Sequence, residues 1–206
     1  MLFRSEEDAY WRADILSSTS EGTDFTLFRQ NQSQGDFHLP LHGEYNVRNA
    51  LAGIAACCRA GIAPQAMRTS LSTFAGVSRR QELLGEWDDI LLIDDFAHHP
   101  TAVEHTLRAI AAAHPQRPIW AIFEPASATN ARALFEERYL TAFTPAAHIV
   151  IGRVPRPERA RDDEPFSPRR LAERLQAQGK KAHYMPDADD LLSHLLTHAQ
   201  IGRAHV

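Results

Sequence analysis

The chain has little of what several large classes of protein require. It contains only two cysteines, the neighbours Cys57 and Cys58, which cannot supply a disulfide framework. We expect two small, partly buried side chains in a reducing compartment. No apolar run approaches the length of a membrane span, and the first residues are too acidic for a signal peptide. The sequence therefore predicts a cytoplasmic protein with no membrane partner.

An excess of positive charge is also missing. The 22 Lys and Arg residues are outnumbered by 26 Asp and Glu residues, which gives a formal net charge of -4, and the basic residues are spread along the chain. This distribution forms no basic stripe, so nucleic acid is not an expected partner. The chain does have 44% hydrophobic residues over 206 positions, which is enough for the core of one large or two small domains.

The first part of the chain reads as a small sheet followed by helices. Three segments of alternating apolar and polar residues, 10–16, 24–30 and 36–41, are separated by turn residues and predict antiparallel strands. An alanine-rich helix is predicted over residues 45–60, because apolar side chains recur at helical spacing and a glycine follows. A second helix is predicted over residues 63–74.

From residue 81 the pattern changes to alternating strands and helices. Residues 81–87 and 90–93 predict a hairpin around Asp88 and Asp89, and the apolar run at 90–93 is typical of a strand buried on both faces. The elements expected after it are a helix from Pro100, a strand at 119–123, a helix at 131–143, a strand at 147–151, a helix at 168–178, a strand at 181–185 and a helix at 187–198. This alternation predicts an α/β fold with a mostly parallel, doubly wound sheet.

A polar cluster follows the strand at 90–93. Asp94, Asp95, His98 and His99 occupy the turn into the next helix, and ligands of open α/β sheets bind at the carboxyl ends of strands. Carboxylates accept hydrogen bonds from sugar hydroxyls or hold divalent cations, while histidines contact phosphate or ligate metals. The residues alone suit a plain turn equally well, with Asp95 capping it and both histidines solvated.

The cluster carries a resemblance to a known family. Asp-Asp-Phe-Ala-His-His-Pro-Thr at residues 94–101 closely resembles the signature that opens the C-terminal domain of the Mur ligases, the ATP-dependent amide-forming enzymes of peptidoglycan synthesis. Further blocks at residues 43–50, 78–80 and 124–129 are similar to this family and occur in the same order.

The resemblance implies a domain organisation. Residues 1–77 would be the end of the central ATP-binding domain, and residues 78–200 a Rossmann-like C-terminal ligase domain with a mostly parallel sheet. Residues 201–206 match the translation of a common sequencing adapter, so we exclude them as a non-native tail. The chain also lacks the glycine-rich phosphate loop of this family, which is typical of a fragment.

The resemblance further implies an ATP site. Asn46 and Asn49 would lie close to the adenine, although Tyr45 stands where the family usually has histidine, and Arg80 would reach the phosphates. The residues alone leave other roles open. Asn46 suits a helix cap, and arginines on a linker are usually solvated.

Asp95 would hold the ribose hydroxyls, and His98 or His99 would lie near the phosphates as the catalytic histidines. His99 has the alternative role of orienting the substrate. Mg²⁺ would bridge the phosphates. A transition-metal site built from the two aspartates and two histidines has suitable ligand types, but adjacent residues rarely aim at one ion, so no metal is assigned to the protein itself.

The block at residues 124–129 would form a second wall of the site. Ser127 and Thr129 are the candidate substrate-binding residues, although both suit an ordinary loop. Ala126 replaces the arginine of the resembling ligases, which changes the expected substrate contacts rather than the fold.

Within the family, the two signature blocks most resemble the branch that recycles cell-wall tripeptide. It joins L-alanyl-γ-D-glutamyl-meso-diaminopimelate to UDP-N-acetylmuramate through an acyl phosphate. The first alternative is the branch that joins L-alanine to UDP-N-acetylmuramate, and the second is a non-catalytic module that binds nucleotide or peptide. Without the phosphate loop, the isolated chain is expected to be inactive.

Overall fold

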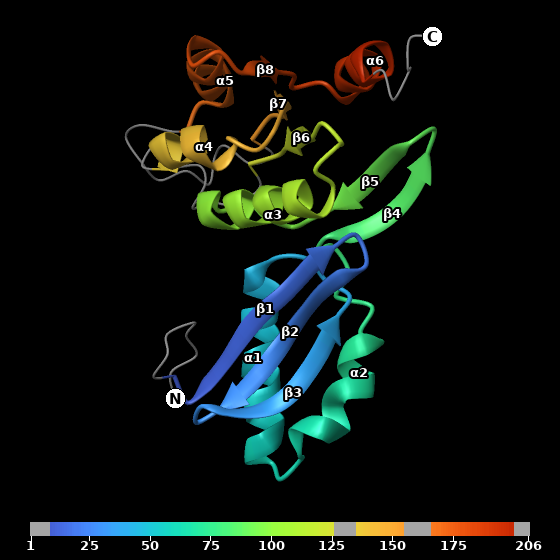
Figure 1. Ribbon diagram of the computed structural model, residues 1–206. Coiled ribbons are helices and arrows are strands. Elements are labelled where there is room, and N and C mark those ends of the chain that lie inside the picture. The colour runs from blue at the N-terminus through green and yellow to red at the C-terminus, as the bar shows by residue number, and fades with distance from the viewer. Residues whose placement is uncertain (1–8, 126–134, 155–165, 200–206) are drawn as a thin grey trace. The chain divides into compact units, whose positions relative to one another are not determined.

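The computed structural model describes residues 9–125, 135–154 and 166–199 (Figure 1). They form two compact units. The first contains the residues up to Gln81 together with Arg108–Pro115, and the second contains Glu82–Leu107 and the residues from Gln116 onward. No helix within the described ranges is long and apolar enough to cross a membrane.

The first unit is built on an antiparallel sheet of three strands. Strands β1 (Trp11–Thr19), β2 (Gly22–Arg29) and β3 (Gln32–Leu39) pair in the order β1-β2-β3, which confirms the three predicted strands. Gly22 has a φ of +132°, and a side chain there would collide with the Leu39 carbonyl, so the first position of β2 requires glycine.

Helix α1 (Glu44–Arg59) covers one face of this sheet (Figure 1). Val47, Leu51 and Ile54 recur at helical spacing and are buried against the inward side chains of the strands, including Phe25. This helix confirms the one predicted over residues 45–60.

The second predicted helix is shorter than expected and interrupted. Its sequence forms the 3₁₀ turn η1 (Pro64–Met67) and then the five-residue helix α2 (Arg68–Ser72). Pro64 begins the turn because its fixed φ suits a first helical position, and no long helix then develops.

In the second unit, β4 (Glu82–Trp87) and β5 (Ile90–Asp94) form the predicted hairpin. Asp88 and Asp89 make its two-residue turn with φ values of 46° and 64°. The prediction that this strand is buried on both faces is wrong. Among the described residues β5 pairs with β4, and Leu92 is 44% exposed because alternate side chains of a two-stranded hairpin face solvent.

The other sheet of this unit is parallel. Strands β6 (Trp120–Phe123), β7 (His148–Ile151) and β8 (Lys181–Tyr184) pair in the order β6-β7-β8, which confirms the α/β class. The helices after β5 are α3 (Pro100–Ala113), whose residues from Arg108 on belong to the first unit, α4 (Glu136–Ala142), α5 (Pro168–Ala177) and α6 (Ala188–His198). Figure 1 shows α4 and α5 on one side of this sheet and α6 on the other.

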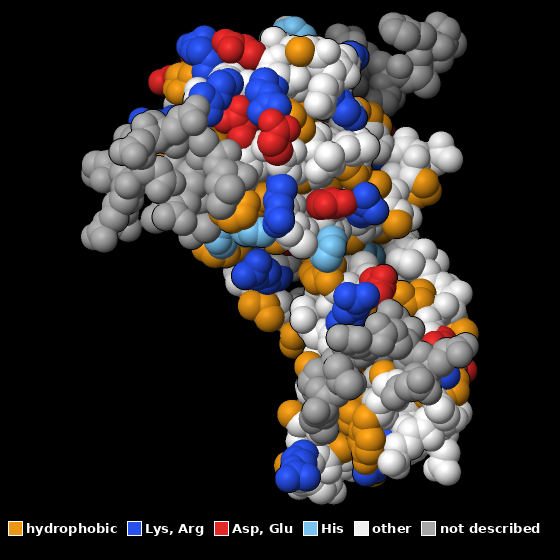
Figure 2. All heavy atoms as spheres, turned by 90° about the vertical axis from the view of Figure 1, so that its left-hand side faces the viewer, with side chains coloured by type: hydrophobic (Ala, Val, Ile, Leu, Met, Phe, Trp, Pro, Cys, Tyr) orange, Lys and Arg blue, Asp and Glu red, His pale blue; other side chains and the backbone are white. Residues whose placement is uncertain are grey.

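The core of the second unit is formed by the parallel sheet and helices α3, α4 and α5. Phe123 and Ile149 point into it from the strands, and Leu171 and Leu175 meet them from α5. Figure 2 shows acidic and basic side chains close together over α4 and α5. Glu136 is the buried member of this charged group. Its side chain is 4% exposed and accepts hydrogen bonds from Arg170 and Arg174.

Candidate functional site

The best-defined part of the candidate site is the turn between β5 and α3. Asp94 ends the strand, and Asp95, His98 and His99 follow it, all half-buried. One carboxylate oxygen of Asp95 accepts the Ala97 amide hydrogen at 2.7 Å, which fixes the chain direction after the strand. Asp95 therefore does stabilise its own turn. A carboxylate has further acceptor positions, so this bond does not exhaust its capacity for a ligand.

The two histidines of this turn are held in opposite ways. The Nδ1 atom of His98 lies 2.8 Å from the Phe96 carbonyl oxygen, so it must carry the proton and donate. The Nδ1 atom of His99 accepts the Thr101 amide hydrogen at 3.3 Å, so it must be unprotonated. In their neutral forms, His98 presents an accepting Nε2 atom and His99 a donating Nε2–H group. Adjacent histidines thus offer one acceptor and one donor.

Helix α4 supports this turn from the core. The Tyr139 hydroxyl donates to the His98 carbonyl oxygen at 2.5 Å, and the Phe135 ring meets the His99 ring edge-on, with ring centres 4.9 Å apart. Tyr139 is fully buried, and burial raises the pKa of its hydroxyl well above the ordinary value. It therefore remains a neutral hydrogen-bond donor.

Sequence reasoning missed these supporting roles. Phe135 and Tyr139 are four residues apart within the helix that the sequence predicts over residues 131–143. Their spacing contains a usable signal, because a tyrosine on the buried face of a helix needs a partner for its hydroxyl. The identity of the partner, 41 residues away, has no local signal.

The residues expected near the nucleotide base and phosphates belong to the first unit. Asn46 lies in the first turn of α1, and its amide donates to the His42 carbonyl oxygen at 2.8 Å. Its bond therefore ties the helix to the residue that precedes it. Asn49 is exposed three positions further along α1. Arg80 is exposed in a turn that its own amide closes by donating to the Val77 carbonyl oxygen at 3.0 Å.

The residues of the predicted ATP site come from both units. The structure brings Asp95, His98 and His99 together within the second unit. Asn46 and Asn49 share α1 in the first unit, which also contains Arg80. An ATP site that combines residues of both units stays a prediction.

The expected second wall is described only at its beginning. Glu124 follows β6 and is exposed, while Pro125 is buried. Ser127 and Thr129, the predicted substrate-binding residues, lie in 126–134, outside the described residues.

The described residues contain no group of three or more His, Cys, Asp or Glu side chains arranged to hold a metal ion. The turn after β5 therefore provides no protein cage for a metal. Mg²⁺ is commonly bound through substrate phosphates with one or two carboxylates, and Asp94 and Asp95 are of a type that fits this use. Chemically, the turn offers carboxylate acceptors for hydroxyls and an imidazole N–H for an anion.

Comparisons with known proteins match most of the chain to one family. The model of the Mur ligase glutamate ligase domain matches residues 79–205, and that of the Mur ligase middle domain matches residues 2–57. A UDP-N-acetylmuramate–L-alanine ligase from Acetivibrio thermocellus is 31% identical over 199 residues, which cover 96% of this chain and 42% of that protein. A ligase of the same name from Streptococcus pneumoniae is 38% identical over 137 residues, covering 66% of this chain and 30% of that one.

Two solved structures are also similar. A murein peptide ligase from Psychrobacter arcticus has a TM-score of 0.64 and 29% identity, covering 94% of this chain and 40% of that chain. The UDP-N-acetylmuramate–alanine ligase of Thermotoga maritima has a TM-score of 0.76, covering 91% of this chain and 40% of that chain, and its 22% identity indicates a shared fold only. The chain spans about two-fifths of the length of the first curated relatives that it matches.

Proposed function

Because the chain belongs to the Mur ligase family, we propose that it supplies nucleotide- and substrate-binding residues of an ATP-dependent ligase that forms an amide on UDP-N-acetylmuramate. In this reaction ATP phosphorylates the muramoyl carboxylate, and the acyl phosphate is then attacked by an amine. The products are the amide, ADP and phosphate. The enzyme acts in the cytoplasm.

The turn after β5 supports this proposal most directly. A ligase of this kind must hold a sugar hydroxyl of the nucleotide and stabilise negative charge during phosphoryl transfer. Asp95 accepts from the ribose hydroxyls of ATP, and the Nε2–H group of His99 donates to an anionic oxygen near the phosphates. His98 is the residue next to His99, and the hydrogen bond from its Nδ1 atom to the Phe96 carbonyl oxygen sets the direction of its ring.

The remaining roles are assigned by the family resemblance. Asn46 and Asn49 contact the adenine, and Arg80 pairs with a phosphate, for which a guanidinium is well suited. Mg²⁺ neutralises charge on the phosphates when it is bound. Ser127 and Thr129 bind the second substrate.

The amine substrate that we propose is the murein tripeptide L-alanyl-γ-D-glutamyl-meso-diaminopimelate, used in peptidoglycan recycling. The motif Asp-Asp-Phe-Ala-His-His supports this choice. The similarity to the Psychrobacter murein peptide ligase is in keeping with it. The second candidate is L-alanine, because the relatives named UDP-N-acetylmuramate–L-alanine ligase reach 31% and 38% identity.

The test is phosphate release by the complete gene product that contains this chain. It is supplied with ATP, Mg²⁺ and UDP-N-acetylmuramate, and with either the tripeptide or L-alanine. Release with the tripeptide alone supports the recycling ligase, and release with L-alanine alone supports the second candidate. Silence with both, while ATP still binds, would favour a non-catalytic nucleotide-binding module.

A pair of histidine variants tests the assigned site in the same assay. His99→Gln should lower kcat/KM by roughly 100-fold, because it removes a group placed beside the transferring phosphoryl group. His105→Gln is the matched control on an exposed position of α3 and should leave the rate within about twofold, as for ordinary surface substitutions. Equal rates for both variants would remove His99 from the mechanism.

A further inference from the structure

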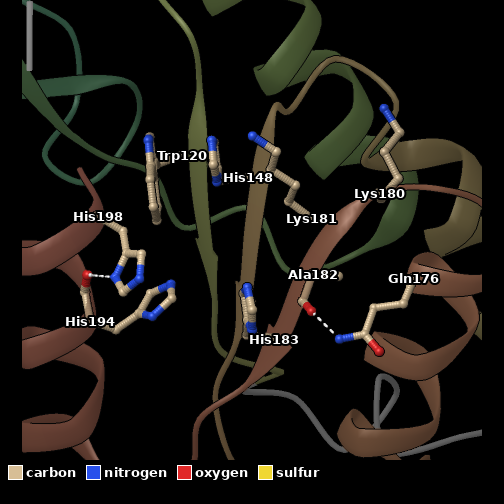
Figure 3. Close-up of a pocket in the computed structure, with 9 residues that line it drawn as sticks. All are labelled: Trp120, His148, Gln176, Lys180, Lys181, Ala182, His183, His194 and His198. Carbon is tan, nitrogen blue, oxygen red and sulfur yellow. Dashed lines mark hydrogen bonds between the residues drawn. The ribbon is translucent and has the colours of Figure 1, made fainter. Parts of the chain in front are cut away.

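A hollow of about 330 Å³ lies beside the parallel sheet of the second unit (Figure 3). The first residue of each strand lines it: Trp120 of β6, His148 of β7 and Lys181 of β8. The hollow is therefore near the amino ends of β6, β7 and β8, whereas the turn with Asp95 follows the carboxyl end of a strand. Nine residues line it in all, and they include Lys180, His183 on β8, and His194 and His198 on α6.

The lining has an unusual charge composition. Four of the nine residues are histidines and two are lysines, and none is Asp or Glu. The chain as a whole has more acidic than basic residues and a formal net charge of -4. The lining of the hollow therefore differs in charge from the chain as a whole. Its volume is at the lower end of the range of about 300–1,000 Å³ that is common for small-ligand sites.

The rings around the hollow are in contact with one another. Trp120 and His148 stack face to face with ring centres 3.9 Å apart, and His194 from α6 meets the edge of the Trp120 ring at 5.9 Å. His194 also lies 4.7 Å from His183 and 4.3 Å from His198. The close-up shows Lys181 beside His148, and these two residues are paired in the register of β7 and β8 (Figure 3).

This crowding disfavours the charged forms of His148 and His194. The pKa of His148 is lowered by partial burial and by the nearby charges of Lys181, His183, His194 and His198. Partial burial and the neighbours His198 and His183 lower the pKa of His194 as well. An anion placed among these rings would reverse the repulsion, because it favours the protonated form of each imidazole. Anion binding and proton uptake are therefore coupled at this position.

From this arrangement we propose that the hollow is a binding site for a small multivalent oxyanion of the phosphate or diphosphate class, and that the site takes up protons as the anion binds. Lys181 supplies a permanent positive charge. The imidazolium N–H groups of His148 and His194 supply donors for phosphate oxygens, which accept several hydrogen bonds at once. The proposal goes beyond the proposed ligase function, since it needs neither the tripeptide nor UDP-N-acetylmuramate.

Lys180 has a different position from Lys181, although both line the hollow. Its amino group donates to the Thr144 carbonyl oxygen at 2.7 Å, and the close-up shows it turned away from the rings (Figure 3). This difference supplies a matched control. A loss of one positive charge at either residue changes the net charge equally, but only Lys181 is placed to contact the anion.

A transition metal is the competing ligand class. His194 and His198 are four residues apart on α6, a spacing that can hold a metal, but among the described residues no three donors are arranged for one. His198 is also oriented by its bond to the His194 carbonyl oxygen, with Nδ1 at 3.0 Å.

The experiment follows the histidine ring nitrogens by NMR in the purified 206-residue chain. Sodium diphosphate and inorganic phosphate are titrated at pH 6 and pH 8, with sodium chloride at matched ionic strength. We expect diphosphate to raise the titration midpoints of His148 and His194, and to bind at least tenfold more tightly at pH 6 than at pH 8. His38, in the first unit, is the internal reference and should not shift.

Variants separate specific binding from bulk electrostatics. Lys181→Gln should weaken diphosphate binding at least fivefold, and Lys180→Gln less than twofold. His148→Gln should remove most of the pH dependence. The circular dichroism spectrum of each variant confirms that it is folded. Three outcomes would each overturn the proposal. Chloride could shift the histidine signals as much as diphosphate does, or Lys180→Gln and Lys181→Gln could weaken diphosphate binding equally. The third is that zinc, and not diphosphate, shifts the histidine signals.

Discussion

The hydroxyl of Tyr139 donates to the carbonyl oxygen of His98 at 2.5 Å and so joins helix α4 to the turn after β5. Tyr139 itself is fully buried between Phe123 and Phe143, with ring centres 5.1 and 6.1 Å away. The histidine turn is thus held by a donor that cannot move without disturbing the core. Under the proposed function, Tyr139 is a positioning residue that acts through His98.

Tyr139→Phe should uncouple the turn from the core. The substitution removes the donor, leaves the His98 carbonyl without this partner, and keeps the ring that fills the core. We expect the free energy of unfolding to fall by about 1–2 kcal/mol. The ring nitrogens of His98 and His99 should shift in the NMR spectrum.

Tyr184→Phe is the control, because it removes a hydroxyl from a half-buried ring of the same unit that is covered by Arg169. It should leave both the histidine signals and the unfolding midpoint in urea almost unchanged. If Tyr139→Phe did the same, the positioning role would be lost.

Glu136 is expected to be the most sensitive charged residue of the second unit. Its carboxylate is 4% exposed and accepts hydrogen bonds from Arg170 at 2.8 Å and Arg174 at 3.2 Å. Glu136→Ala removes the acceptor shared by the two arginines, which are 40% and 37% exposed and can be partly solvated, and it should cost about 1–3 kcal/mol. Urea unfolding followed by circular dichroism measures the loss.

Glu137 next to it supplies the comparison. Its side chain is 74% exposed and pairs with Arg174 at 2.5 Å. An exposed pair of this kind contributes roughly 0–1 kcal/mol, so Glu137→Ala should have a small effect. Similar costs for the two substitutions would mean that burial of Glu136 does not determine its contribution.

Much of this fold follows from local sequence signals. Gly61 after the alanine-rich run gives the end of α1 to within a few residues, and Ser167 before Pro168 caps α5 by accepting the Arg170 amide hydrogen at 3.2 Å. The alternation of strands and helices predicted the α/β class of the second unit. These signals succeed because they act within one or two turns of the chain.

Burial and long-range contact were less predictable. The apolar run at β5 is consistent with a buried strand, yet Ile90 is 38% exposed in a hairpin, because composition does not show which strands pair. The histidine hollow draws His148, His183 and His194 from β7, β8 and α6, and no spacing in the sequence indicates that these elements meet there.

The hairpin turn between β4 and β5 can be made more stable by substitution. Asp88 and Asp89 both have positive φ, the conformation for which Asn-Gly is the preferred pair in a two-residue hairpin. The double substitution Asp88→Asn with Asp89→Gly should raise the free energy of unfolding by roughly 0.5–1 kcal/mol, because glycine adopts a positive φ without strain and asparagine is favoured at the first position of this turn. Urea unfolding provides the measurement. A loss of stability would show that the aspartates have contacts worth more than the backbone relief.

The histidines around the hollow should make the protein less stable in mild acid. The pKa values of His148 and His194 are lowered in the folded chain from an ordinary value of 6.5. As the pH falls through 6.5, the unfolded chain therefore binds protons more readily than the native state does, and stability declines. Above that pH these histidines are neutral in both states, and their contribution disappears.

Urea midpoints between pH 8 and pH 5.5, without phosphate buffer, measure this dependence of stability on pH. Replacing both histidines with Gln should flatten it, whereas His105→Gln should not, because His105 is exposed on α3 and does not line the hollow. A slope unchanged by removal of His148 and His194 would place the acid sensitivity elsewhere, with His42 the next residue to replace, since burial lowers its pKa too.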